Sequence, residues 1–190
     1  MPRGRGIPER WLDYTAFGER IPGTPFIPSK TPLYDRLCAR LPSAERYTPQ
    51  KLVEEIRKTG HTVKMVINLT ATERYYDPEI FSRLNIDYVK IMVSGCPLPS
   101  IDLRMNFMEY VKAFKERWNY SSDDDSVICV HCTHGVNRTG YFICKYLVNF
   151  EGWEAQEVIR QFQLHRGHKF TRQYLVDDIL RSNPDEIISS

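Results

Sequence analysis

The sequence predicts an α/β domain in which strands alternate with helices and the chain ends in helices. Three apolar runs, residues 63–69, 86–93 and 127–130, read as buried strands. The third run leads into a loop with two glycines and then into residues 141–148, whose apolar character is typical of a buried helix. We therefore expect the loop to lie at the carboxyl edge of a sheet, where α/β domains place their sites.

The first 32 residues carry two short arginine-bearing stretches and six of the twelve prolines, which predicts an extended arm lying over the domain. Within this arm, residues 1–10 are expected to form a flexible basic N-terminus. Residues 11–182 would form a single domain, because a chain of 190 residues can bury one sizeable core. The last residues, 183–190, read as a polar tail.

Helix boundaries are indicated by several local signals. Thr48 and Pro49 are typical of a helix N-cap and first turn, and the residues that follow predict a helix that stops at Gly60. A longer amphipathic helix is expected from Ser100. Apolar residues recur there at steps of three and four: Leu103, Phe107, Val111, Phe114 and Trp118. Further helices are expected over residues 139–150, 153–166 and 171–182.

The most informative segment is residues 131–140, which read His-Cys-Thr-His-Gly-Val-Asn-Arg-Thr-Gly. A strand end followed by a helix N-terminus presents free N–H groups and the positive end of the helix dipole, which favour anions. The same field favours the thiolate of Cys132, and Arg138 offers a planar fork for two phosphate oxygens. The pattern predicts a nucleophile within a phosphate-binding loop whose other members are Thr133, His134, Gly135, Val136, Asn137 and Gly140.

Zinc binding is an alternative for the same segment, because Cys129-x-x-Cys132 and His131-x-x-His134 have ligand-like spacing. However, residues 129 and 131 would point to the opposite face of the strand from residues 130 and 132. No second CxxC pair occurs in the chain, so we expect no metal site. His131 is expected to order the loop by hydrogen bonding, with action as a base as the alternative.

Composition excludes several classes of protein. A net charge of +2 gives no global argument for nucleic-acid binding. Five cysteines without regular spacing argue against a disulfide scaffold and for a reducing compartment. The N-terminus, Met-Pro-Arg-Gly-Arg-Gly, has no apolar stretch, and no run of 18 apolar residues exists. We therefore expect an intracellular chain without a signal peptide or a membrane span.

Residues 131–140 resemble the loop of the cysteine-dependent phosphatases, the superfamily of protein tyrosine and dual-specificity phosphatases. The full string is most similar to that of the RNA 5′-triphosphatases, a branch that includes capping-enzyme domains and RNA-associated phosphatases. Residues 11–26, 67–77 and 166–173 extend the resemblance over nearly the whole chain. It implies a central mixed sheet flanked by helices, with the phosphate loop at a strand-to-helix junction. Asn68 stands where relatives often have aspartate.

The resemblance also implies a function: a metal-independent enzyme, without a cofactor, that removes the γ- and then the β-phosphate from triphosphorylated RNA ends. Cys132 would form a cysteinyl-phosphate, and the Thr139 hydroxyl would stabilise the departing thiolate. His134 and Asn137 mark the RNA-directed branch, with loop rigidity as their alternative role. A monomer is expected, in the nucleus or alternatively the cytoplasm, with RNA 5′-triphosphate ends and RNA-processing proteins as candidate partners.

The segment that follows the second predicted strand lacks an acid. Protein phosphatases of this superfamily use an aspartate on a mobile loop to protonate the leaving oxygen, whereas residues 94–100 contain no Asp or Glu. Asp102 is the nearest carboxylate, and it would lie in the first turn of a helix. A missing acid matters less for a polyphosphate substrate, because a phosphate oxygen is a better leaving group than tyrosine.

Two other enzymes remain as alternatives. A dual-specificity protein phosphatase would use Asp102 as the acid. A capping-enzyme triphosphatase domain would be followed by a nucleotidyltransferase domain with a Lys-x-Asp-Gly motif, and no such tetrapeptide occurs here. A protein that reads phosphate ends without catalysis would not need both Cys132 and Arg138.

Residues 158–176 contain no acidic residue but four cationic ones: Arg160, Arg166, Lys169 and Arg172. They predict either a solvated helix face or a cationic rim for the outer phosphates of RNA. From this group we take Arg166, Lys169 and Arg172 as candidate RNA-binding residues, and the resemblance singles out Arg172. Arg74, which follows a predicted strand, is a further rim candidate, with an ordinary turn as the alternative.

Overall fold

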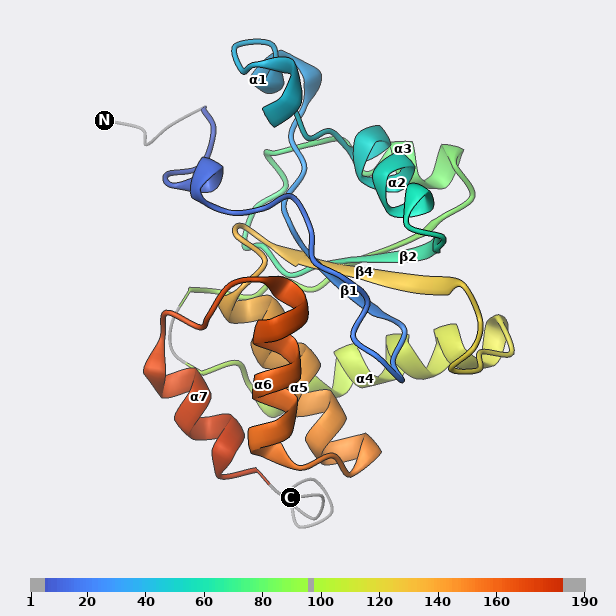
Figure 1. The fold of residues 1–190 in the computed structure, drawn as a ribbon, viewed down its shortest axis with the longest axis vertical. Coiled ribbons are helices and arrows are strands. Elements are labelled where there is room, and N and C mark those ends of the chain that lie inside the picture. Colours follow the sequence, from blue (N-terminus) through green and yellow to red (C-terminus); the bar gives the residue numbers. More distant parts are fainter. Residues whose placement is uncertain (1–5, 96–97, 183–190) are drawn as a thin grey trace.

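In a computed structural model, which describes residues 6–95 and 98–182, a parallel sheet lies between two layers of helices (Figure 1). The predicted polar tail and the first five residues of the predicted N-terminus lie outside the described residues. Strands pair in the order β1-β4-β2-β3. Their bounds are Phe26–Lys30 for β1, Thr62–Asn68 for β2, Asp87–Lys90 for β3 and Ser126–Cys132 for β4.

The expected α/β fold is confirmed, and the sheet is more regular than the expected mixed sheet. All pairings among the four described strands are parallel. Antiparallel pairing in the described part of the chain is confined to an isolated bridge between Phe17 and Ser29. The reason is connectivity: helices carry the chain from one strand to the next across a face of the sheet, which leaves successive strands parallel.

Strand β1 corrects the expectation that the first 32 residues only lie over the domain. It pairs along its length with β4, from Phe26 opposite Ile128 to Lys30 opposite Cys132. Pro28 has no N–H to donate, but an edge strand needs donors on one side only. The prolines therefore concealed an edge strand that supports the loop-bearing strand directly.

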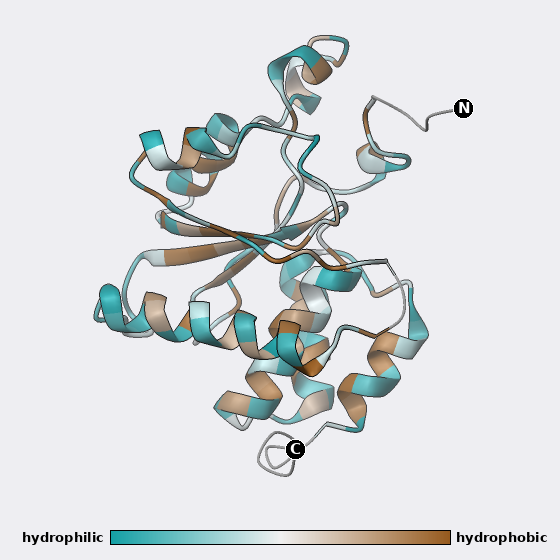
Figure 2. Cartoon of the chain, turned by 180° about the vertical axis from the view of Figure 1, so that it is seen from behind, coloured by the Kyte–Doolittle hydropathy of each residue, from teal (hydrophilic) through white to brown (hydrophobic). Residues whose placement is uncertain are grey.

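Helices α4 to α7 cover one face of the sheet (Figure 1). Their bounds are Ile101–Arg117 for α4, Asn137–Glu151 for α5, Ala155–Arg166 for α6 and Gln173–Leu180 for α7. Apolar side chains from these helices form one core with the strands, including Phe107, Ile143, Phe162 and Ile179. Figure 2 shows hydrophobic colour along the strands, whereas the helices carry both colours, as expected for elements buried on one side.

The other face is covered by three helices (Figure 1), namely α1 at Asp35–Cys38, α2 at Pro49–Lys58 and α3 at Glu79–Arg83. A second core forms here from side chains such as Leu52, Phe81 and Trp11, the last from a 3₁₀-helix at Trp11–Asp13. A further 3₁₀-helix covers Ser43–Glu45. The first and third α-helices were not predicted, because neither is long enough to show a hydrophobic period.

The predicted helix caps are observed. The Thr48 hydroxyl accepts a hydrogen bond from the Lys51 N–H at 3.3 Å, with Pro49 at the first helical position. Ser100 caps α4 through a bond of 3.4 Å from the Leu103 N–H. Strand β3 is shorter than residues 86–93, because its partner β2 ends at Asn68, opposite Lys90. Ladder pairing on that side stops there.

Candidate active site

The predicted loop lies between the end of β4 at Cys132 and the start of α5 at Asn137. Gly135 has a φ of 68°, and a Cβ built there would lie 2.1 Å from the carbonyl oxygen of Ser29 in β1. Such a distance leaves no room for any side chain. At Gly140 a Cβ would lie 2.5 Å from a ring carbon of Phe162, so α5 packs closely beneath α6. Both glycines are required by close contacts.

Cys132 is 3% exposed and has the properties of a stabilised thiolate. Burial raises the pKa of its thiol, but the Arg138 charge, the Thr139 hydroxyl and the N–H groups of Thr139 and Gly135 outweigh burial and lower the pKa overall. The buried Thr139 Oγ1 has no hydrogen bond of ordinary geometry to another described residue. It is therefore available to the sulfur.

Arg138 is held at the mouth of the loop by three acceptors. Its Nη2 donates to Thr133 Oγ1 at 3.0 Å, and its Nη1 donates to the carbonyl oxygens of Val93 at 2.9 Å and Leu69 at 3.2 Å. These carbonyls follow β3 and β2, respectively. The sheet edge thus fixes a planar guanidinium beside Cys132, as a bidentate phosphate clamp requires.

His131 is completely buried behind the loop. Its Nε2 lies 2.7 Å from the Tyr76 hydroxyl, and its Nδ1 lies 3.4 Å from the Cys132 carbonyl oxygen. Burial lowers the pKa of His131 to about 3, so the imidazole is neutral near pH 7. A neutral ring without exposure to solvent suits the ordering of the loop and not proton transfer.

The Asn68 side chain connects this histidine to a wider polar network. Asn68 Nδ2 donates to the hydroxyls of Tyr76 and Tyr88, at 3.0 Å each, and its Oδ1 accepts from the Thr70 N–H and from Lys90 Nζ at 3.1 Å. Because Asn68 donates to Tyr76, the Tyr76 proton is free to point to the ring of the buried histidine. That contact leaves the histidine proton on Nδ1, facing the Cys132 carbonyl.

The sequence had suggested no role for Asn68, placed Tyr76 only as a rim candidate beside Arg74, and did not indicate Lys90. Lys90 Nζ also donates to the carbonyl oxygens of Thr70 and Thr72, at 2.5 and 2.9 Å, and burial lowers its pKa to about 8. An asparagine two residues before Thr70 at a strand end is a recognisable turn signal. The distant Lys90 left no comparable local signal.

Asn137 contacts the segment that carries Arg172 on one side of the loop. Asn137 exchanges two hydrogen bonds with Thr171, the residue before Arg172. The Arg172 guanidinium contacts the Gly95 carbonyl and donates to the Tyr174 hydroxyl at 3.0 Å. Lys169 is exposed in the same connection between α6 and α7. The partly exposed Arg172 guanidinium therefore lies beside Gly95, in the segment whose sequence lacks an acid.

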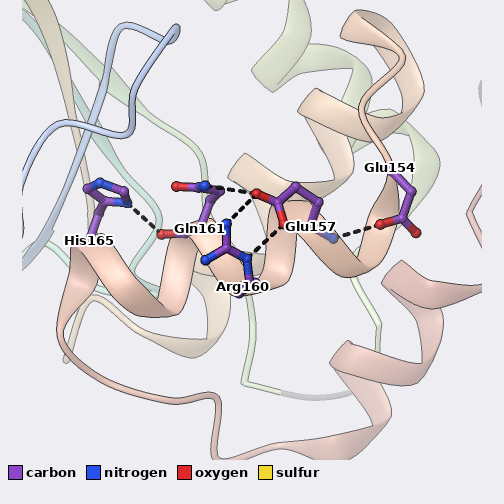
Figure 3. Close-up of polar contacts among 5 residues, drawn as sticks. All are labelled: Glu154, Glu157, Arg160, Gln161 and His165. Atoms are coloured by element: carbon purple, nitrogen blue, oxygen red, sulfur yellow. Dashed lines mark hydrogen bonds and ion pairs between the residues drawn. The ribbon is translucent and has the colours of Figure 1, made fainter.

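Arg166 does not reach this rim, which contradicts its expected role in RNA contact. It is 1% exposed, and its guanidinium donates to backbone carbonyls beneath the loop, including Gly135 at 2.9 Å. Arg166 is the last residue of α6 and turns inward, whereas Arg160, six positions earlier, turns outward and pairs with Glu157 at 2.6 Å (Figure 3). Charge alone could not reveal this difference in direction.

Arg74 lies in the connection that follows β2 and is exposed. Its Nη2 donates to the Tyr75 hydroxyl at 3.1 Å, and its guanidinium lies 5.0 Å from the centre of that ring. It therefore rims the same sheet edge as the loop, in agreement with its placement after a strand.

The opposite side of the loop is covered by the N-terminal arm. His134 Nε2 donates to the Glu9 carbonyl oxygen at 2.8 Å, and its ring stacks on Tyr14 at 4.7 Å between centres. Tyr14 also contacts His168, at 5.0 Å between ring centres. Part of the segment expected to be flexible, at Glu9, is thus in contact with the loop.

The spacing that suggested zinc does not bring the cysteines together. Cys129 belongs to the core on the α1–α3 side of the sheet, and Cys132 to the core on the α4–α7 side. Within residues 6–95 and 98–182, no group of three or more His, Cys, Asp or Glu side chains is arranged to hold a metal ion. The strand alternation explains why these thiols diverge.

A family comparison agrees with this geometry. The model of the dual-specificity phosphatase catalytic domain matches residues 48–180, which include the whole loop. The chain belongs to the dual-specificity phosphatase family. The candidate nucleophile Cys132, at the end of β4, lies within the range that this family model matches.

Curated relatives include the RNA/RNP complex-1-interacting phosphatase of Bos taurus, 40% identical over 190 residues. That match covers 98% of this chain and 56% of the relative, so the chain spans about half of its relative's length. A tyrosine-protein phosphatase of Autographa californica nuclear polyhedrosis virus is 39% identical over 174 residues, covering 92% of this chain and 99% of the viral protein. Both are more than a third identical to this chain.

Solved structures show the fold alone. The phosphatase Tk-PTP in its active form superposes with a TM-score of 0.62 at 14% identity, covering 89% of this chain and 97% of that one.

Among the described helices, none is both long enough and apolar enough to cross a bilayer.

Proposed function

We propose that the chain is an RNA 5′-triphosphatase and diphosphatase that removes the γ- and then the β-phosphate from triphosphorylated RNA ends. One observation carries this proposal: the Arg172 guanidinium contacts the Gly95 carbonyl, within the segment where a protein phosphatase carries its acid. A cation at this place suits a substrate with further phosphates beyond the one being cleaved.

The proposed reaction has two steps. The Cys132 thiolate attacks the terminal phosphorus in line, the phosphoanhydride bond breaks, and the shortened RNA end leaves with the bridging oxygen. Arg138 and the loop N–H groups hold the equatorial oxygens, where charge resides in the transition state. Water then attacks the cysteinyl-phosphate and releases inorganic phosphate, while the Thr139 hydroxyl stabilises the departing thiolate. The lowered pKa of the Cys132 thiol supports this path.

The leaving group supports a polyphosphate substrate. As leaving groups, the tyrosine hydroxyl has a pKa of about 10 and a phosphate oxygen has a pKa of about 6. Four pKa units correspond to at most roughly 5 kcal/mol of leaving-group stabilisation that an acid need not supply. Residues 94–100 contain no Asp or Glu, and Asp102 is exposed in the first turn of α4. An enzyme without an acid there is better matched to an anhydride than to an ester.

The names of several relatives point in the same direction, since the bovine, human and rodent relatives are RNA/RNP complex-1-interacting phosphatases. On this basis RNA 5′-ends are the proposed partners, together with RNA-processing proteins. We propose that the enzyme acts as a monomer in the nucleus, and that it needs no metal or other cofactor.

A dual-specificity protein phosphatase is the second candidate. It is favoured by the viral relative, whose name is tyrosine-protein phosphatase. In that case Asp102, which follows the Ser100 cap of α4, would protonate the leaving oxygen. The two candidates therefore differ in whether Asp102 or Arg172 matters for turnover.

The deciding experiment uses triphosphorylated RNA labelled at the γ- or the β-phosphate, with EDTA present, beside a phosphotyrosine peptide. We expect release of γ-label first, β-label second, and no effect of EDTA. A higher kcat/KM on the peptide than on RNA would favour the protein phosphatase. Loss of activity in EDTA, restored by zinc or magnesium, would overturn the metal-independent mechanism.

A further inference from the structure

Arg166 is a buried cation whose hydrogen bonds, among the described residues, go to the loop and to the N-terminal arm. Its Nε donates to the Gly135 carbonyl oxygen at 2.9 Å, and its Nη2 donates to the His134 carbonyl oxygen at 3.0 Å. The remaining bonds go to Thr15: Nη2 to its carbonyl oxygen at 2.9 Å and Nη1 to its hydroxyl at 2.6 Å. No carboxylate is among these partners.

These bonds determine the direction of two peptide groups in the loop. In a trans peptide the C=O and the N–H of the next residue point in opposite directions. Because Arg166 draws the carbonyls of His134 and Gly135 outward, the N–H groups of Gly135 and Val136 turn to the other side, into the loop. The Gly135 N–H is among the groups that lower the pKa of the Cys132 thiol.

The charge of Arg166, like its hydrogen bonds, favours an anion in the loop. Burial lowers its pKa, to about 10, which still leaves the guanidinium protonated near pH 7, and both Tyr47 and Cys132 act to raise it. A buried charge without a carboxylate partner is costly. An anion in the loop, either the Cys132 thiolate or a bound phosphate, offsets part of that cost.

Thr15 fixes the guanidinium from the side of the arm. Its hydroxyl accepts from Arg166 and lies 3.1 Å from His168 Nε2, to which the Thr15 N–H also donates at 3.0 Å. The arm is anchored on both sides of Thr15. Lys30 Nζ donates to the Tyr14 carbonyl oxygen at 2.8 Å, and a Cβ at Gly18 would lie 2.8 Å from the Arg166 Cα.

We propose that Thr15 and Arg166 are a positioning pair that aims the N–H groups of Gly135 and Val136 at the phosphate, which makes the N-terminal arm part of the catalytic apparatus. The pair touches neither substrate nor sulfur and acts through the loop. The inference rests on the cysteinyl-phosphate chemistry of the proposed function, but not on RNA as the substrate.

The test compares Arg166→Met, Arg166→Lys and Thr15→Val with Arg160→Met as the matched control. Arg160 lies on the same helix, is 60% exposed and pairs only with residues of that helix among the contacts drawn in Figure 3. Each variant is assayed on para-nitrophenyl phosphate and on triphosphorylated RNA across pH, and its thermal midpoint is recorded.

For Arg166→Met we expect kcat to fall by about a hundredfold or more, as when an oxyanion donor is lost. KM should change by less than about threefold, since the lost contacts act mainly in the transition state. The acidic limb of kcat/KM should move to higher pH, because the Cys132 thiolate loses the nearby Arg166 charge and the fixed direction of the Gly135 N–H. Arg166→Lys should retain part of the activity, Thr15→Val should lose about five- to tenfold, and Arg160→Met should match the wild type.

Equal losses on both substrates support the pair, because the loop serves every phosphate monoester and anhydride alike. If the wild type proves inactive on RNA but the losses appear on the aryl phosphate, the proposed function fails and the positioning pair stands. A folded Arg166→Met with an unchanged pH limb and a lower thermal midpoint alone would overturn the inference. If Arg166→Met does not fold, then a Thr15→Val variant whose kcat and acidic pH limb equal those of the wild type would overturn the inference.

Discussion

Asn137 and Thr171 exchange two hydrogen bonds across the mouth of the loop. Asn137 Nδ2 donates to Thr171 Oγ1 at 2.7 Å, and the Thr171 N–H donates to Asn137 Oδ1 at 3.0 Å. Asn137 is the first residue of α5, and Thr171 directly precedes Arg172. The pair therefore fixes the residue before Arg172 against the start of α5.

Removal of one of these hydrogen bonds should lower kcat/KM on RNA and leave turnover of small substrates nearly unchanged. We expect Thr171→Val to lower kcat/KM on triphosphorylated RNA by about threefold, since one hydrogen bond that positions Arg172 is lost. Turnover of para-nitrophenyl phosphate should stay within about twofold. Thr171→Ser keeps the hydroxyl and should behave as the wild type. Equal losses on both substrates would show that the pair serves the loop and not Arg172.

The covalent mechanism predicts that Cys132→Ser abolishes turnover and retains binding of RNA ends, because a serine alkoxide does not form near neutral pH but the N–H cradle remains. Arg138→Lys should be nearly as damaging, since an ammonium cannot replace the bidentate fork. Single-turnover kinetics and equilibrium binding separate the two effects. Substantial turnover in either purified variant would contradict a cysteinyl-phosphate intermediate.

Gly135→Ala should damage both stability and activity. Its φ of 68° disfavours a side chain, and the new Cβ would lie 2.1 Å from the Ser29 carbonyl oxygen. Overpacking of this kind costs typically about 1–3 kcal/mol of unfolding free energy. Gly152→Ala is the control, because Gly152 has a similar φ of 71° but no atom within 4 Å of an added Cβ. Urea unfolding that gave equal losses for both would assign the whole effect to backbone strain.

The pH profile should report the thiol of Cys132. Because its pKa is lowered overall, the reactive thiolate forms below the usual pH range of a cysteine, and kcat/KM on an aryl phosphate should rise with pH through that pKa. Thr139→Val removes a hydrogen-bond donor to the thiolate, so the pKa and the acidic limb should move to higher pH. An unmoved limb would exclude the Thr139 hydroxyl from this role.

The phosphate loop and its flanking elements could be predicted because their signals are local. A strand, two glycines required by close contacts and a following apolar helix lie within residues 127–148, and the Thr48 and Ser100 caps are read from single residues. Strand β1 was missed because Pro28 reads as a strand breaker until its edge position is known.

Other parts of the site depend on contacts between distant residues. The direction of Arg166 follows from its place at the end of α6, beneath the loop, and its partner Thr15 is 151 positions away in the chain. Tyr76, in the connection after β2, contacts His131 in β4, although the two residues are 55 positions apart in the chain. Composition shows that such residues are present, but only tertiary packing shows which groups they meet.

The substrate proposal is tested most directly by comparing Arg172→Ala with Asp102→Asn on triphosphorylated RNA and on para-nitrophenyl phosphate. Arg83→Ala, an exposed arginine on the far face of the sheet, is the control. We predict that Arg172→Ala lowers kcat/KM on RNA at least about tenfold, or 1.4 kcal/mol, and hardly alters the aryl phosphate. Asp102→Asn should cost less than about threefold on RNA. A large loss of kcat/KM on RNA in Asp102→Asn, together with an unchanged kcat/KM on RNA in Arg172→Ala, would contradict the polyphosphate substrate.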